Sequence, residues 1–225
     1  MIYNKKVTAL VPIKGETEIV NGNLRLFNNQ PLYRLLLEKL EHIFAIDEII
    51  VDSDLYFLED ELLSSFKKVK FVKRPAELQN NETSINEIIR YDISQSTEGE
   101  LFIQTHVNKP LVKKETIAKA LKLFVEEEDN YDSLLSVNKY QSRFYDNKKN
   151  PINHDSKNLI RTKELPPVYE ENSCFYIFTR ESFEKNNHRI GENPLFYETS
   201  TIESLELKDN LSYKLAEILT LYQEL

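Results

Sequence analysis

Short apolar runs alternate with amphipathic segments along the first two thirds of the chain, and this alternation constrains the fold more than any other feature. Five runs have the apolar character of buried strands: residues 7–11, 48–51, 69–72, 101–103 and 133–137. Between them, apolar residues recur at helical spacing, as in Leu32, Leu36 and Leu40. Strands that alternate with helices indicate an α/β protein, with a mostly parallel sheet and helices on both faces.

The pattern changes after the fifth run. Residues 139–172 are rich in aromatic and basic side chains and contain three prolines. We predict one domain over residues 1–225, in which residues 139–172 form an inserted loop, a hairpin lid or a dimerisation arm. Beyond this insertion, residues 174–178 are expected to form another strand and residues 210–224 an amphipathic helix.

Composition excludes several classes of protein. The chain has 29 Lys+Arg against 37 Asp+Glu, so its net charge of −8 argues against broad nucleic-acid or anionic-membrane binding. Its apolar runs are shorter than the roughly 18–20 residues that a membrane span needs, and the first residues do not lead into a signal-like apolar stretch. The single cysteine, Cys174, cannot form an internal disulfide. We therefore expect a soluble, cytoplasmic protein.

Polar segments follow the predicted strands. In parallel α/β sheets, ligands bind beyond the C-terminal ends of the strands. We therefore expect one crevice lined by four segments: residues 14–25, residues 52–54, Arg74 and residues 104–108. Among the histidines, His106 is the best placed for function, because it follows a strand directly. The sequence contains no nucleophile elbow, zinc-type Cys/His set or Walker lysine loop.

An ordered set of short motifs makes this picture specific. The motifs are residues 12–14 (PIK), 23–25 (NLR), 30–32 (QPL), 51–54 (VDSD), 73–78 (KRPAEL), 103–106 (IQTH) and 165–172 (LPPVYEEN). Together they span nearly the whole chain and resemble the acylneuraminate (CMP-sialic acid) cytidylyltransferase family. The resemblance implies a Rossmann-like nucleotidyltransferase fold with a dimerisation arm, and a homodimer. It also implies transfer of CMP from CTP to the anomeric hydroxyl of a 2-keto sugar acid, with release of pyrophosphate.

The same resemblance implies roles for individual residues. Catalysis would involve Lys14 and Arg25. The nucleotide would be bound by Pro12, Lys14, Gly15, Asn23, Asp54 and Arg74. The acidic sugar would be bound by Gln104, His106, Arg143 and Arg161. A Mg²⁺ cofactor would be held by Glu206 and Asp209.

The chain departs from the family pattern at its cations. The first loop carries Glu16 and Glu18 where the family has basic residues, and Lys208 interrupts the usual Asp-x-Asp metal pair. Lys109 stands where a neutral polar residue is expected. Three hypotheses remain open. The first is an active cytidylyltransferase in which Lys109 or Lys208 compensates for the missing loop cations. The second is a degenerate family member that acts as a nucleotide-binding, sugar-binding or partner subunit. The third is a nucleotidyltransferase for another acceptor, such as a phosphonate or a different acidic sugar.

Overall fold

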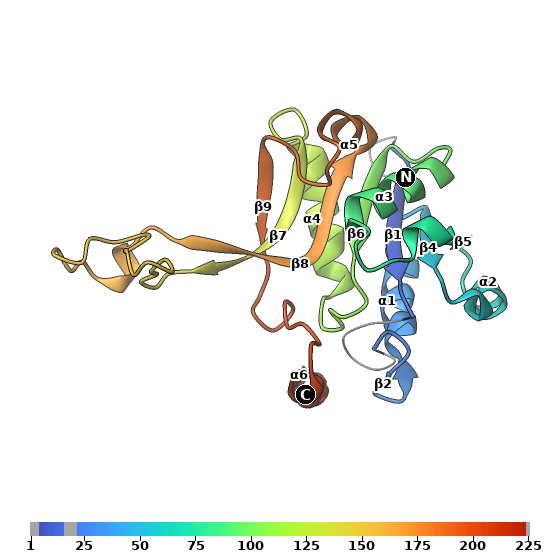
Figure 1. Cartoon of the computed structure of the whole chain (residues 1–225), viewed down its shortest axis with the longest axis horizontal. Helices are drawn as coiled ribbons and strands as arrows, with labels where there is room; N and C mark the ends of the chain where they lie inside the picture. The colour runs from blue at the N-terminus through green and yellow to red at the C-terminus, as the bar shows by residue number, and fades with distance from the viewer. Residues whose placement is uncertain (1–4, 16–21, 224–225) are drawn as a thin grey trace.

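A seven-stranded sheet forms the centre of the protein in the computed structural model, which describes residues 5–15 and 22–223 (Figure 1). The strand order is β5-β4-β1-β6-β8-β7-β9, and β8 alone runs antiparallel to its neighbours among these strands. The strands are β1 Val7–Ile13, β4 Glu48–Ser53, β5 Val69–Lys73, β6 Leu101–Thr105, β7 Ser133–Tyr140, β8 Val168–Thr179 and β9 Pro194–Glu198. The mostly parallel sheet expected from the sequence is thus confirmed.

Helices cover both faces of this sheet. They are α1 Leu32–Glu41, α2 Glu59–Ser65, α3 Ile85–Gln95, α4 Lys114–Glu126, α5 Arg180–Asn186 and α6 Asn210–Gln223. Side chains alternate along β1, so Ala9 and Val11 pack in one apolar cluster and Leu10 in the other. The first cluster takes its helical residues mainly from α1 and α4, and the second takes them from α3 and α5 (Figure 1). The core is therefore two apolar layers separated by the sheet.

The first residues of α3 and α1 show why these two helices begin where they do. Ser84 begins α3 with a capping box, in which the Ser84 side chain accepts from the backbone and Glu87 accepts from the Ser84 N–H. Pro31 precedes α1 and has extended backbone geometry, which suits the residue before the first helical turn. Pro31 also ends a short hairpin of β2 Leu26–Phe27 and β3 Gln30–Pro31. This hairpin connects the first loop to α1 (Figure 1).

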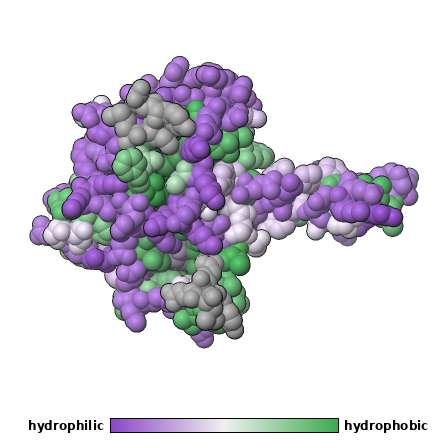
Figure 2. Space-filling model, turned by 180° about the vertical axis from the view of Figure 1, so that it is seen from behind, coloured by the Kyte–Doolittle hydropathy of each residue, from purple (hydrophilic) through white to green (hydrophobic). Residues whose placement is uncertain are grey.

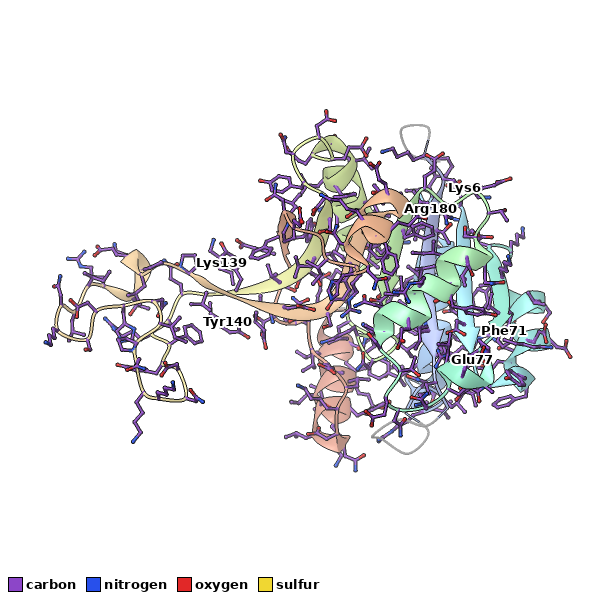
Figure 3. All side chains as sticks on the ribbon, turned by 45° about the horizontal axis from the view of Figure 1, so that its top comes forward. Lys6, Phe71, Glu77, Lys139, Tyr140 and Arg180 are labelled. Atoms are coloured by element: carbon purple, nitrogen blue, oxygen red, sulfur yellow. The ribbon has the colours of Figure 1, made fainter. Side chains whose placement is uncertain are left out.

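The segment predicted as an insertion projects from the sheet as a long arm (Figure 1). Beyond a register shift between Leu135 and Val137, β7 and β8 continue as a two-stranded ribbon that ends at the Tyr140–Val168 pair. Lys139 and Tyr140 lie on this ribbon, clear of the helices (Figure 3). The 3₁₀-helix η3 Thr162–Glu164 belongs to the far part of the arm. Within the described residues, the helices are too short or too polar to cross a membrane.

Candidate functional site

A cavity of about 300 Å³ opens at the C-terminal ends of β1 and β6. Its walls come from four parts of the chain: Pro12, Gly22–Asn23, His106–Asn108 and Glu206–Lys208 together with Tyr213. This edge of the sheet is where ligands bind in parallel α/β proteins. The wall includes two of the four segments expected from the sequence, residues 14–25 and 104–108, but it does not include residues 52–54 or Arg74. Residues 206–208 form a further wall, as the family resemblance implied for Glu206, and Tyr213 of α6 adds a contribution that the sequence did not predict.

Hydrogen bonds hold the two described ends of the first loop together. The Asn23 side chain donates to the carbonyl oxygen of Lys14 over 2.8 Å. The Gly15 N–H donates to Oδ1 of Asp54, also over 2.8 Å. A side chain at Gly15 would approach Leu55 to 2.7 Å, so this close contact favours glycine. Asn23, Asp54 and Gly15 therefore shape the loop, while Glu16 and Glu18 lie outside the described residues.

The two predicted catalytic cations lie at the edges of this loop. The Lys14 ammonium bonds to Oδ1 of Asn81, and its side chain is not part of the cavity wall. Arg25 donates to Oδ1 of Asn210 over 2.7 Å, and its guanidinium lies 3.9 Å from the ring centre of Tyr213. The two Arg25 contacts attach the loop to α6. The catalytic roles of Lys14 and Arg25 remain predictions.

Gln104 lies at the end of β6 and is completely buried. Its amide nitrogen donates to the carbonyl of Thr105 over 3.1 Å and lies 3.1 Å from Nε2 of His106. Its carbonyl oxygen accepts from the Arg189 guanidinium over 2.7 Å, and this guanidinium lies 3.6 Å from the ring centre of Tyr176. Arg189 was not predicted from the sequence. Arg189 lies 85 positions after Gln104 in the sequence, and its hydrogen bond holds the Gln104 side chain in one orientation.

His106 lines the cavity, as expected for a functional histidine. Burial, together with the nearby charges of Arg189 and Lys109, lowers its pKa to about 3. The imidazole is therefore neutral near pH 7. Since Gln104 offers an N–H to Nε2, the proton of this neutral ring belongs on Nδ1. His106 can form hydrogen bonds with a ligand but is a weak base at neutral pH.

The two arginines predicted for the sugar site lie in the arm. Arg143 donates to the carbonyl oxygen of Ile160 over 2.6 Å, and Arg161 directly precedes η3. Because the arm projects away from the sheet, the structure does not bring these side chains to Gln104 within one chain (Figure 1). Their substrate role remains a prediction.

Arg74 lies in the protein interior rather than in the cavity wall. It is 2% exposed, and its Nε donates to Oδ2 of Asp52 over 2.8 Å. Asp92 is buried beside this pair on α3, and burial, followed by the charge of Asp52, raises its pKa well above the ordinary range. Burial also raises the pKa of Asp52 to about 6, although Arg74 opposes the shift. Arg74 thus forms a buried ion pair with Asp52.

The carboxylates predicted to hold Mg²⁺ already have other partners. Glu206 accepts from Lys109 Nζ over 3.2 Å and from the Asn108 amide over 3.1 Å. Asp209 instead accepts from the backbone N–H of Ser212 over 2.7 Å, at the start of α6. In the described part of the chain, acidic, histidine and cysteine side chains do not form groups of three or more that could hold a metal. This donor set fits a protein-held Mg²⁺ poorly, because ammonium and amide groups occupy the oxygens that the ion needs.

Sequence comparison relates the chain to cytidylyltransferases. A family model described as cytidylyltransferase matches residues 16–223. N-acylneuraminate cytidylyltransferase of Escherichia coli O18:K1:H7 (strain RS218 / NMEC) is 23% identical over 219 residues, which cover 94% of this chain and 51% of that protein. The chain thus spans about half the length of this relative. The post-translational flagellin modification protein B of Campylobacter coli is 22% identical over 217 residues, covering 91% of this chain and 90% of that protein.

Solved structures share the fold. A CMP:2-keto-3-deoxy-manno-octonic acid synthetase complexed with CTP has a TM-score of 0.70 at 11% identity, covering 98% of this chain and 100% of that chain. The 4-diphosphocytidyl-2C-methyl-D-erythritol synthase of Anaerococcus prevotii DSM 20548 also has a TM-score of 0.70, at 12% identity, covering 96% of each chain. At these identities the likeness establishes a common Rossmann-like α/β architecture.

Proposed function

The chain belongs to the cytidylyltransferase family, and from this premise we propose that it transfers CMP from CTP to the anomeric hydroxyl of a 2-keto sugar acid. The observation that carries the proposal is the cavity at the ends of β1 and β6, where the first loop, the end of β6 and residues 206–208 meet. A relative named N-acylneuraminate cytidylyltransferase supports a sugar acid as the acceptor.

In the proposed reaction, the anomeric oxygen of the sugar attacks the α-phosphorus of CTP. A new P–O bond forms, the bond from the α-phosphorus to the bridging oxygen breaks, and pyrophosphate leaves with that electron pair. The hydroxyl proton passes to solvent. Such a transfer depends on positioning and on cations that stabilise the negative charge of the phosphates. Lys14 from the first loop and Lys208 from the cavity wall are candidates for this role.

Gln104 and His106 are candidates for the acceptor side. Gln104 is held by Arg189, and the neutral imidazole of His106 supplies hydrogen-bonding groups without a charge. The neutral ring of His106 suits the hydroxyl and amide groups of a sugar better than a triphosphate. Gln104, whose buried amide bonds to Thr105, His106 and Arg189, would orient this ring. The guanidinium of Arg189 lies behind them, and Glu171, 3.7 Å away, offsets part of its positive charge.

The test is pyrophosphate release with CTP, Mg²⁺ and a panel of 2-keto sugar acids, with ATP, GTP and UTP as nucleotide controls. We expect release with CTP and one acid. Release with a phosphonate instead would favour the third hypothesis from the sequence. Absence of release, together with a flat calorimetric titration of CTP and Mg²⁺, would contradict the proposal. It would support the second hypothesis from the sequence, a degenerate family member without catalysis.

We also propose that the protein is a homodimer formed through the arm, residues 139–172. Large apolar side chains are exposed along this arm, among them Tyr145, Ile152 and Leu159, and Figure 2 shows apolar surface near its far end. Exposed apolar surface of this kind is typical of an interaction site. Sedimentation at micromolar concentration should give the mass of two chains, and a monomer under those conditions would contradict this proposal.

A further inference from the structure

We infer that Lys109 and Lys208 take the place of a protein-held divalent cation where the phosphates of the nucleotide bind. This inference rests on the proposed function, because Lys208 lines the proposed nucleotide cavity and Lys109 lies behind the same wall. It starts from a disagreement: the carboxylates expected to bind metal are engaged by lysine and amide donors. Two ammonium groups, those of Lys109 and Lys208, lie beside Glu206 instead.

Lys109 is fixed in an unusual environment for a lysine. It is 4% exposed, and its ammonium lies 3.2 Å from both the carbonyl oxygen of Ser204 and Oε2 of Glu206. A backbone hydrogen bond of 2.9 Å, from the Leu207 N–H to the Asn108 carbonyl oxygen, holds the segment that follows β6 beside residues 204–207. An ammonium has three N–H donors, so these two acceptors leave one donor for a ligand. A buried ammonium of fixed position can act as a pre-organised charge.

Lys208 lies on the accessible side of the same carboxylate. Its ammonium is 3.8 Å from Oε2 of Glu206, and its side chain is 68% exposed. Glu206 and Lys208 line the first cavity and also a neighbouring cavity of about 360 Å³ that reaches the base of the arm. The cluster therefore lies on a wall shared by two cavities. A phosphate at this wall could contact Lys208 from either side.

The two ammonium groups change the charge of this cluster. Glu206 and Asp209 alone would carry a formal charge of −2, and with Lys109 and Lys208 the formal charge of the four groups is 0. A site of charge −2 repels a polyphosphate until a divalent cation binds, and the two lysines remove this repulsion without a metal ion. Binding of the nucleotide therefore does not require a protein-held Mg²⁺.

The experiment measures binding of CTP and of inorganic pyrophosphate by calorimetry, in EDTA and in Mg²⁺. We expect both anions to bind the wild-type protein in EDTA. Lys208→Met should weaken this binding by about tenfold or more, as expected for loss of one charge-assisted contact. Glu206→Gln should strengthen it, because the competing negative charge is removed. The matched control is Lys122→Met, which changes an exposed lysine in an ion pair on α4 and should have no effect.

Lys109→Met is the second variant, and its thermal unfolding is measured first because the side chain is buried. Because the Lys208 side chain is exposed, Lys208→Met is expected to fold, and the test does not depend on whether Lys109→Met folds. The inference is overturned if the wild type binds both anions only with Mg²⁺, or if Glu206→Gln abolishes binding. The pyrophosphate arm separates the two proposals: Lys208-dependent pyrophosphate binding without CTP binding would support the cation site and contradict the cytidylyltransferase function.

Discussion

Two cation–carboxylate pairs lie just beyond parallel strands of this protein, and they differ in what covers them. Arg74 and Asp52 are 2% and 0% exposed and are joined at 2.8 Å. Lys109 and Glu206 are joined at 3.2 Å, but Glu206 is 36% exposed and lines the cavity. The first pair is enclosed between the sheet and α3. The second pair is open to a ligand on one side.

The comparison shows that sequence context alone does not separate a structural cation from one that can bind a ligand. Both cations are followed by proline, at Arg74-Pro75 and Lys109-Pro110, and both come shortly after a strand. The difference arises from the elements packed above them. Asp92 of α3 lies close enough for the Arg74 charge to act on it, whereas residues 204–206, far along the chain, surround Lys109.

The largest effect is expected for Arg74→Met. This change leaves Asp52 buried without its cation, which costs about 3–5 kcal/mol of unfolding free energy. Urea denaturation measures the loss, and Lys73→Met, at an exposed neighbour, serves as the control. A variant that keeps wild-type stability but no longer binds CTP would show that Arg74 contacts the nucleotide, as the sequence analysis predicted.

Lys14→Ala tests a cation outside both pairs. Its ammonium contacts only Asn81 among the described residues, so the melting temperature should stay close to that of the wild type. If Lys14 stabilises the reacting phosphate, turnover should fall by about two to three orders of magnitude. Parallel loss of stability and turnover would instead make Lys14 structural. Asn81→Ala, which removes the partner and keeps the cation, is the matched variant.

The smallest effect is expected for Asp92→Asn, and it is measured as the dependence of the unfolding free energy on pH. In the folded protein the pKa of Asp92 is raised, and that of Asp52 is raised from 3.8 to about 6, with burial as the main cause. The folded state therefore binds these protons more tightly than the unfolded chain. Stability is greatest below the unfolded pKa and falls as the pH rises through the folded pKa.

Asparagine cannot ionise, so the variant carries no charge beside Asp52 at any pH in this range. Asp92→Asn should therefore flatten the profile and raise the unfolding free energy at pH 8 by on the order of 1 kcal/mol. Urea denaturation between pH 5 and about 8 measures this. Asp129→Asn, at an exposed position, should keep the wild-type profile. An unchanged slope in Asp92→Asn would contradict the raised pKa.

Much of the fold could be predicted because its signals are local. Apolar runs mark the strands, and Ser84 with Glu87 marks the start of α3. The cavity was predicted at the correct edge of the sheet because parallel strands end there together. Arg189 could not be predicted in the same way. It follows α5 after Asn187, whose left-handed backbone ends the helix, and its contact with Gln104 depends on tertiary packing.

The order of the strands has a consequence for synthesis of the chain. Strands β5, β4, β1 and β6 are complete once residue 105 has been made, but β6 pairs on its other side with β8, residues 168–179. Until then the nascent sheet presents an edge of unpaired backbone groups, which favours aggregation. The arm lies between β7 and β8, so each residue in it prolongs this exposure. A longer arm thus extends the reach of the folded protein and also the period in which the unfinished chain needs protection.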